Sequence, residues 1–382
     1  MHIYSDISYQ SYQHVNQMLH RCLRQRDVHS VFLDRVVIHQ PGLRHGLSVC
    51  RRIAAKPRAP RLTTNTAGPY VTGIRRLVNL PSVCRAIDFA NEHLIRFQLP
   101  ATADTAVTFV PSAALNRTLM RYPDLVYYCV HDASKQSYHR RNLAYEQELV
   151  ARTRLVFCDN ATVLARLANG TSYIDLSNEV APAPASKFFL VPPPIPDCFF
   201  TLNFKTPHKF FDGVYFGNIH DQVDQDELRR LAYAGLRLAI ISERRLSFEH
   251  RSLTYFPVQV NPAELGRLIA LSRSILLPYK NSEFMRTVSP AKIHQSIVTG
   301  LPVFASNRRL CSEYELLPME ALRCTADLKL FSTEDGKTHA HKATLERFRE
   351  SFLLARIADL IVTPANPRAP RPQALTQNPA LL

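Results

Sequence analysis

The chain has 382 residues, of which 46% are hydrophobic and 21% charged, as is typical of a soluble globular protein long enough for two domains. No apolar run is long enough to cross a membrane, and the eight cysteines are scattered without a CxxC pair, which argues against a membrane anchor, a disulfide framework and a zinc site. The formal net charge of +15 favours an anionic partner, and the lack of a zinc-finger, basic-zipper or RNP pattern argues against nucleic acid.

The amino-terminal half alternates short apolar runs with helical patterns. Residues 1–7 and 28–33 are predicted as strands, and residues 14–26 as the amphipathic helix between them. No GxGxxG follows the first strand, so we expect no dinucleotide-binding site of that type. The amino terminus also lacks a basic-then-apolar signal, and we expect a cytoplasmic protein.

Residues 41–75 mix Pro, Gly and basic side chains with few apolar repeats, which predicts a long cationic loop. One interpretation is a solvated insertion. The other is contact with anionic headgroups, or with a lipid-linked pyrophosphate, at the cytoplasmic face of the inner membrane. In that case the acceptor or membrane contacts are Arg51, Arg52, Lys56, Arg58 and Arg61.

The apolar run 125–130 predicts a strand buried on both faces, and it ends at His131 and Asp132. Polar residues at the carboxyl end of a central parallel strand face the crevice of an α/β protein, so this pair is the candidate for acid–base chemistry. The alternative is that Asp132 caps a helix and His131 is a hydrogen-bonded structural residue. Asp159, just before the next helical pattern, is interpreted as a capping residue.

A proline-rich linker at 193–208 divides the chain. A polyproline segment is stiff and cannot join a sheet, so we expect one domain over residues 1–192 and another over 209–338. The second domain opens with an apolar strand that ends at Gly217 and Asn218. Arg244 lies at the end of its next strand, where it is either a phosphate contact or part of a solvated turn.

Residues 274–306 predict a strand, a helix and a second strand. Ser289 can cap this helix and Pro290 suits its first position, while Gly300 ends it. The helix therefore begins at the carboxyl end of a strand, where free N–H groups attract phosphate, and Lys292 adds a positive charge in its first turn. The stretch predicts an anion site; the alternative is an ordinary crossover with a surface lysine.

The order Pro-Tyr, variable loop, Ser-Pro-x-Lys and Gly-x-Pro-Val in this stretch resembles the donor-binding segment of GT-B glycosyltransferases, which hold the diphosphate of a nucleotide sugar there. The resemblance implies that Lys292, the amides near Ser289 and Arg244 stabilise the leaving group, so that no metal is needed. It also implies that Tyr279 and Gln295 position the base or the ribose. Such enzymes often carry Glu where this chain has Gln295, which can hydrogen-bond a hydroxyl without a charge.

Two further patterns carry the resemblance. Val-Tyr-Tyr-x-x-x-Asp, ending at Asp132, is similar to the acceptor domain of GT-B enzymes, including xanthan-type glucuronosyltransferases. Tyr-x-Gly-Asn-Ile around Gly217 is similar to the first strand of their donor domain. In inverting members an Asp or His of the first domain deprotonates the acceptor, a role implied for Asp132 with His131 in reserve. Retaining members often show two Glu across the donor loop, and Glu283 has no such partner.

The resemblance implies an α/β protein of the GT-B class, with two facing Rossmann-like domains, parallel sheets and a helix at 339–362 that returns to the first domain. Residues 363–382 are Pro-rich and lack a core pattern, so we expect a disordered tail there. The implied activity is metal-independent transfer of a sugar, from a UDP-sugar or related donor, to a lipid-linked or saccharide acceptor in bacterial surface or exopolysaccharide synthesis. The alternative is a catalytically silent scaffold that binds nucleotide sugar, which the amide at Gln295 favours.

Overall fold

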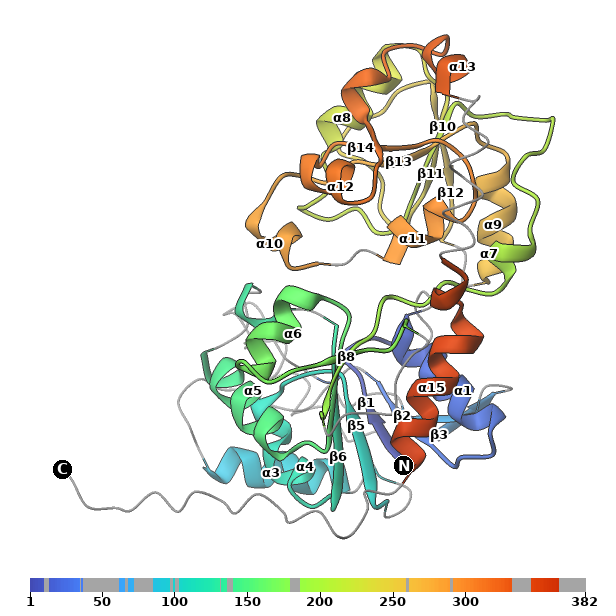
Figure 1. The fold of residues 1–382 in the computed structure, drawn as a ribbon. Coiled ribbons are helices and arrows are strands. Elements are labelled where there is room, and N and C mark those ends of the chain that lie inside the picture. Colours follow the sequence, from blue (N-terminus) through green and yellow to red (C-terminus); the bar gives the residue numbers. More distant parts are fainter. Residues whose placement is uncertain are drawn as a thin grey trace, which may run out of the picture.

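The chain builds two β-sheets, each covered by helices, one above the other in Figure 1. The computed structural model describes residues 1–9, 14–34, 36, 62–65, 68–71, 85–96, 99, 103–130, 132–135, 140–178, 186–258, 261–288, 291–331 and 345–363. None of the helices in these ranges is both long and apolar enough to cross a bilayer.

The first sheet has nine strands in the order β3-β4-β2-β1-β5-β6-β7-β9-β8. Its strand pairs are parallel except β3 with β4. The strands are β1 (His2–Tyr4), β2 (Val31–Leu33), β3 (Leu62–Asn65), β4 (Gly68–Val71), β5 (Thr105–Thr108), β6 (Asp124–Cys129), β7 (Leu155–Cys158), β8 (Ile174–Asp175) and β9 (Phe188–Leu190).

The hairpin of β3 and β4 corrects the predicted loop at 41–75, which is wrong over these two strands. β4 pairs with β2, and the Tyr70 ring is buried against Tyr9 with 4.6 Å between ring centroids. Tyr70 is a buried aromatic residue near the edge of the sheet, and it belongs to no apolar repeat in the sequence. The rest of the predicted loop that carries the five basic candidates lies outside the described residues.

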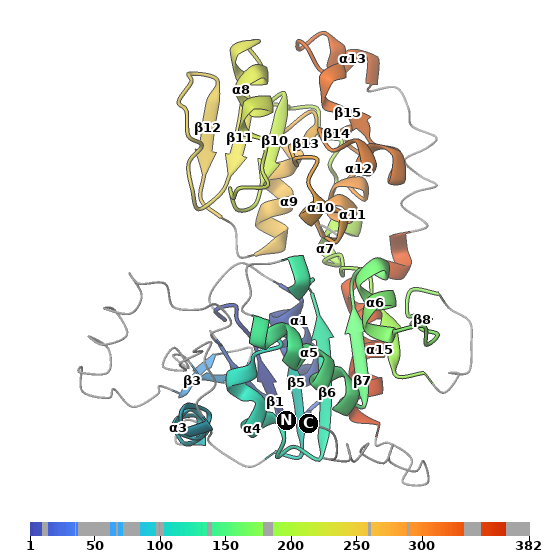
Figure 2. The same cartoon turned by 90° about the vertical axis from the view of Figure 1, so that its left-hand side faces the viewer.

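Helices cover both faces of the first sheet. Apolar side chains of α1 and of the carboxyl-terminal α15 share one core with the sheet, and those of α3 to α6 share the core on its other face. Figure 2 shows α5 and α15 on opposite sides of this sheet. The helices of the first half are α1 (Val15–Gln25), α3 (Arg85–Arg96), α4 (Asn116–Leu119), α5 (Arg140–Arg152) and α6 (Ala161–Ala168), with 3-10 turns at Ala113–Leu115 and Ala133–Lys135.

The second sheet has six strands, all parallel, in the order β12-β11-β10-β13-β14-β15. Helices α9, α11 and α12 pack on one face and α8 and α13 on the other. The strands are β10 (Gly213–Phe216), β11 (Leu238–Ile241), β12 (Leu253–Phe256), β13 (Ile275–Leu277), β14 (Val303–Ala305) and β15 (Leu317–Pro318). The helices are α7 (Cys198–Thr201), α8 (Gln225–Tyr233), α9 (Pro262–Ala270), α10 (Glu283–Arg286), α11 (Ala291–Ile297), α12 (Arg308–Glu313) and α13 (Asp327–Phe331), with a 3-10 turn at Met319–Ala321.

Two chain segments cross side by side between the sheets. The backbone N–H of Ile195 donates to the Phe348 carbonyl at 2.8 Å, and the N–H of Glu350 donates back to Ile195 at 2.7 Å. After a 3-10 turn at Glu346–Phe348, α15 (Glu350–Val362) returns to the first sheet and packs against α1 (Figure 1), where Arg26 pairs with Asp359. This confirms the predicted crossing helix.

Candidate functional site

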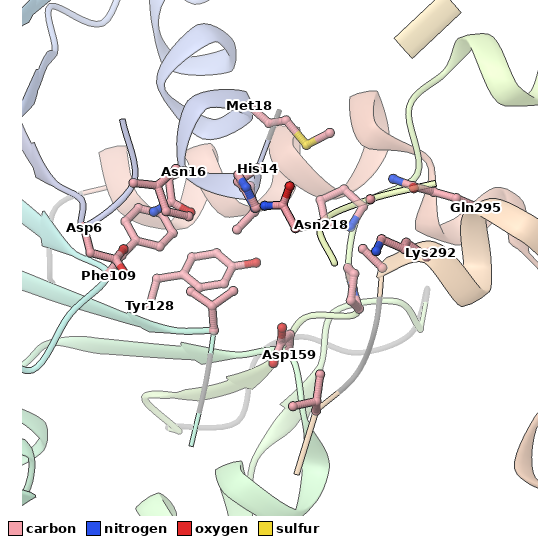
Figure 3. A pocket seen from close by; sticks show the side chains of 18 of the residues that line it. Asp6, His14, Asn16, Met18, Phe109, Tyr128, Asp159, Asn218, Lys292 and Gln295 are labelled. Carbon is pink, nitrogen blue, oxygen red and sulfur yellow. The ribbon is translucent and has the colours of Figure 1, made fainter. Parts of the chain in front are cut away.

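A cavity of about 470 Å³ lies between the two sheets, at the carboxyl ends of their central strands. The residues that follow β1, β5, β6 and β7 form one wall, and those that follow β10 and β13, together with the start of α11, form the other. Figure 3 shows side chains of both walls pointing into the space between them. Open α/β sheets bind ligands at this edge, because the crevice there is not filled by the crossover helices.

Lys292 in α11 is the buried cation of the second wall. Its ammonium lies over the rings of Tyr215 and Tyr279, with Nζ 5.2 Å and 5.8 Å from their centroids. Burial lowers the pKa of Lys292 to about 8. No carboxylate of the described residues forms an ion pair with it. A cation held in this way is stabilised by an anionic ligand more strongly than a solvated lysine would be.

Gly217, at the end of β10, provides the space that Lys292 occupies. Its φ is +120°, and a Cβ added there would overlap the Lys292 ammonium. Glycine is therefore required here for its backbone conformation, and an added Cβ would push the flexible end of the Lys292 side chain out of this position. The sequence predicts a glycine that lets phosphate approach the backbone, whereas the structure shows a lysine over it.

Other predicted donor residues share this wall. Asn218, Tyr279 and Gln295 all line the cavity, and Tyr279 and Gln295 are buried. Arg244 is exposed and does not line the cavity. The predicted helix-start residues Ser289 and Pro290 lie outside the described residues.

His220 joins this wall, although the sequence motif did not indicate it. Its Nδ1 accepts the backbone N–H of Gln222 at 3.2 Å, which leaves Nε2 as the donor of the neutral ring. Partial burial, and then the nearby charge of Lys292, lower the pKa of His220. The wall therefore holds an ammonium and an imidazole close enough to influence each other, a pair suited to an anion with several oxygens.

The opposite wall carries aromatic rings and two carboxyls. Phe109 and Tyr128 stack with 5.0 Å between centroids and an interplanar angle of 21°. Burial raises the pKa of Asp6 to about 6, and backbone N–H groups of Asp6 and Ile7 partly offset this effect. Burial raises the pKa of Asp159 well above the ordinary value of an aspartic acid. Both carboxyls therefore hold their protons to a higher pH than a solvated aspartic acid does, and Asp6 is still mostly ionised at pH 7.

Asp6 and Asp159 differ from the sequence-based assignments. Asp6 lies two residues beyond the end of β1, so the rule that polar residues at strand ends face the crevice could have found it. Asp159 was interpreted as a capping residue, but the cap of α6 is Asn160, whose side chain accepts the Val163 N–H at 3.1 Å.

Asp132, the predicted base, does not line the cavity. Its Oδ1 accepts hydrogen bonds from Ser134 N at 2.9 Å and Ser134 Oγ at 2.6 Å, and from Arg166 Nη2 at 3.0 Å. Arg166 also pairs with the buried Glu146. These contacts give Asp132 the structural role that the alternative interpretation describes, and its role as a base stays a prediction. His131 lies outside the described residues.

Within the described residues, no group of three or more His, Cys, Asp or Glu side chains is placed to hold a metal ion. Metal independence stays a prediction, because a nucleotide ligand can bring its own cation.

Comparisons with known proteins identify the fold. No protein-family model and no curated protein sequence matches the chain. The structure of HepE from Anabaena, in complex with UDP and glucose, matches with a TM-score of 0.54 at 14% identity, over 94% of this chain and 98% of that one. The trehalose 6-phosphate synthase of Burkholderia multivorans matches with a TM-score of 0.53 at 10% identity, again over 94% and 98%.

The chain has the GT-B fold. The predicted fold class is thereby confirmed: two sheets of parallel strands with their helices face each other across a cavity. In a GT-B fold this cavity is the space between the two domains. At these identities the comparison establishes the fold alone, so the activity has to be argued from the cavity. The xanthan-type subtype stays a prediction.

Proposed function

We propose that the chain transfers a sugar from a nucleoside-diphosphate sugar to an acceptor hydroxyl. The observation that carries the proposal is Lys292, a buried cation held over Gly217 without a carboxylate partner among the described residues. A diphosphate would supply the missing negative charge. His220 Nε2–H and the side chains of Asn218 and Gln295 would add polar contacts from the same wall.

The chemistry is displacement at the anomeric carbon. The acceptor oxygen forms a bond to this carbon, the bond from the carbon to the diphosphate oxygen breaks, and the nucleoside diphosphate leaves with the electron pair. Lys292 and His220 stabilise the charge that develops on the leaving oxygen. Because both groups belong to the second wall, the leaving group lies there and the acceptor approaches from the first wall.

Asp6 is our proposed base. A carboxyl with a pKa of about 6 is ionised at neutral pH, and a base is most effective when its pKa lies near the working pH. Asp159 faces the same cavity, but burial raises its pKa well above the ordinary value, which favours the protonated form as a hydrogen-bond donor. Asp132, the base predicted from the sequence, is held by Ser134 and Arg166 outside the cavity.

The finer assignments rest on the sequence resemblance. We propose UDP as the nucleotide, which the UDP in the HepE structure supports by analogy, and transfer of a hexosyl or glucuronosyl group without a metal ion. The proposed acceptor is lipid-linked or a saccharide, in bacterial surface or exopolysaccharide synthesis. The net charge of +15 and the basic segment at 51–61 support peripheral association with an anionic membrane surface.

The first test is nucleotide binding. We expect one of UDP, GDP, ADP and CMP to raise the midpoint of thermal unfolding in EDTA, because a ligand that binds only the folded state stabilises it. Lys292→Met should abolish the shift. Lys280→Met, which removes an exposed lysine near the same site, should retain it. Absence of a shift with all four nucleotides, in EDTA and again with Mg²⁺, would refute the donor site.

Turnover separates the enzyme from a silent scaffold, the alternative that Gln295 favours. A transferase should release nucleoside diphosphate from the sugar nucleotide that stabilises it, and Asp6→Asn should slow this release without weakening nucleotide binding. A scaffold would bind the same nucleotide and release none, with or without the substitution.

A further inference from the structure

The end of the cavity away from Lys292 holds two further polar residues, Asp6 and Asn16, and Asn16 is held by Ser5. In Figure 3, Asp6 and Asn16 lie at this end, and Lys292 and Gln295 lie at the other. Asn16 Nδ2 donates to Ser5 Oγ at 2.8 Å, which ties α1 to the residue just before Asp6. The proposed function uses Asp6 but does not account for Asn16.

Asn16 presents a hydrogen-bond acceptor that nothing in the described chain satisfies. The residue is fully buried, it lines the cavity, and its Oδ1 has no hydrogen-bond partner. Ser5 Oγ donates its own proton to the Ile7 carbonyl at 3.3 Å, so it can only accept from Asn16. This directs the Asn16 amide nitrogen toward Ser5 and leaves the oxygen unpaired. A buried acceptor without a partner is costly, and a ligand that donates to it removes the cost.

The walls between the two polar ends are apolar. Phe109 and Tyr128 form a stacked pair, and Met18 and Val15 of α1 line the same space. A ligand that fits here has an apolar face against these side chains and hydrogen-bond donors at its end. Both protein groups at that end, the Asp6 carboxylate and Asn16 Oδ1, are acceptors, so the ligand has to bring both protons.

We propose that this end of the cavity binds the acceptor as a polyhydroxy ring that presents two neighbouring hydroxyls, one to Asp6 and the other to Asn16 Oδ1. This inference rests on the proposed function and specifies its acceptor as a saccharide-like diol, rather than a phenol or a simple alcohol. Asn16 is a specificity-determining residue: it selects the acceptor and takes no proton.

The step remains balanced with this acceptor. The hydroxyl at Asp6 passes its proton to the carboxylate as its oxygen bonds to the anomeric carbon, and the nucleoside diphosphate leaves with the electrons of the broken bond. The hydroxyl at Asn16 keeps its proton and fixes the ring in place. An acceptor with only one hydroxyl would leave Asn16 Oδ1 unpaired at every stage.

The experiment compares two small probes on the wild-type protein in saturating UDP. cis-1,2-Cyclohexanediol and cyclohexanol have the same apolar ring and differ by one hydroxyl, and their dissociation constants can be measured by saturation-transfer NMR. We expect the diol to bind at least about fivefold more tightly, as pairing one buried acceptor predicts. Asn16→Leu should make the two probes equal, with the UDP affinity unchanged.

Thr118→Val is the matched control. It also removes a buried side-chain oxygen that lacks a partner, but Thr118 lies in α4 and does not line the cavity. The Thr118→Val variant should still bind the diol more tightly than cyclohexanol. Equal binding of both probes to wild-type protein that binds UDP would overturn this inference alone, even if Asn16→Leu failed to fold. Absence of UDP binding would overturn the proposed function and this inference with it.

Discussion

The wall from the second sheet presents Lys292 and His220 to the cavity, whereas the wall from the first sheet presents Asp6, Asp159 and a stacked aromatic pair. Among the described residues of the cavity, both carboxyls belong to the first wall and the buried ammonium to the second. A substrate with an anionic leaving group and a hydroxyl nucleophile would be oriented by this division. Under the proposed function, this difference would place the leaving group and the acceptor against different sheets.

The largest effect on the reaction rate is expected from a substitution in the first wall. We expect Asp6→Asn to lower the rate of nucleoside diphosphate release by about 10²- to 10⁴-fold, the usual contribution of a general base, with UDP affinity unchanged. The rate is measured with the sugar nucleotide that stabilises the protein.

Asp159→Asn is the matched control for Asp6→Asn. Burial raises the pKa of Asp159 well above its ordinary value and so favours the neutral acid, which a neutral amide resembles, and we expect less than about a tenfold change in rate. A large loss from Asp159→Asn with little from Asp6→Asn would exchange the two roles. A selective rate loss from Asp132→Asn, with stability retained, would instead restore the base predicted from the sequence.

The next largest effect is expected from Gly217, which leaves space for the Lys292 ammonium. Gly217→Ala places a Cβ where the Lys292 ammonium lies, at a φ of +120° that other residues rarely adopt. We expect UDP affinity to fall by at least about tenfold, because Lys292 is displaced from the cavity wall, and the free energy of unfolding to fall by about 1–3 kcal/mol. Calorimetric titration and chemical denaturation measure the two quantities.

Gly235→Ala is the control that distinguishes backbone strain from steric overlap with Lys292. Gly235 also has a positive φ, +86°, but nothing lies within 4 Å of an added Cβ. This control should lose about 1 kcal/mol of stability and keep its UDP affinity. If Gly217→Ala also kept its affinity, the ammonium would not need this position to bind the nucleotide.

The charge of Lys292 should make UDP affinity depend on pH. UDP affinity should fall by about twofold from pH 7 to 8 and more steeply above pH 8, at most about tenfold per pH unit, as the free protein loses the proton that the diphosphate needs. Lys292→Met should bind weakly at every pH. An affinity that stayed flat in the wild type up to pH 9.5 would mean that Lys292 does not contact the diphosphate.

Stability without ligand should change in the opposite direction. The pKa of Lys292 lies below its ordinary value in the folded protein, so the unfolded chain binds more protons between pH 8 and the ordinary lysine range. The contribution of Lys292 to the free energy of unfolding therefore rises with pH across that window. Its burial is a cost at neutral pH that a diphosphate would offset.

The sequence was informative where local chemistry fixes local structure. The predicted strand, helix and strand around Lys292 are present as β13, α11 and β14, and Gly300 after the helix has a φ of +72°. The rule about strand ends located the edge of each sheet that lines the cavity. The rule about strand ends did not identify Asp6, because the predicted strand at 1–7 includes that residue, whereas β1 ends at Tyr4.

The remaining parts depend on contacts between distant segments. Nothing near Gly217 indicates that Lys292 lies over it, because the two residues meet only when β10 and α11 pack together. Asn16 belongs to an ordinary amphipathic helix, and its unpaired oxygen exists only because Ser5 already donates to Ile7. Arg244 illustrates the reverse case, a basic residue at the correct strand end that stays outside the cavity.

Arg244 therefore gives the smallest expected effect. Its side chain is exposed, so its charge acts on a diphosphate through water and is screened by salt. We expect Arg244→Ala to weaken UDP binding by less than about threefold at physiological ionic strength, and less still in high salt. Arg245→Ala is the control, because the neighbouring Arg245 is also exposed and lies 3.8 Å from Glu249. A tenfold loss from Arg244→Ala alone, independent of salt, would mean that Arg244 enters the cavity when the nucleotide binds, and the cationic wall would then extend to the end of β11.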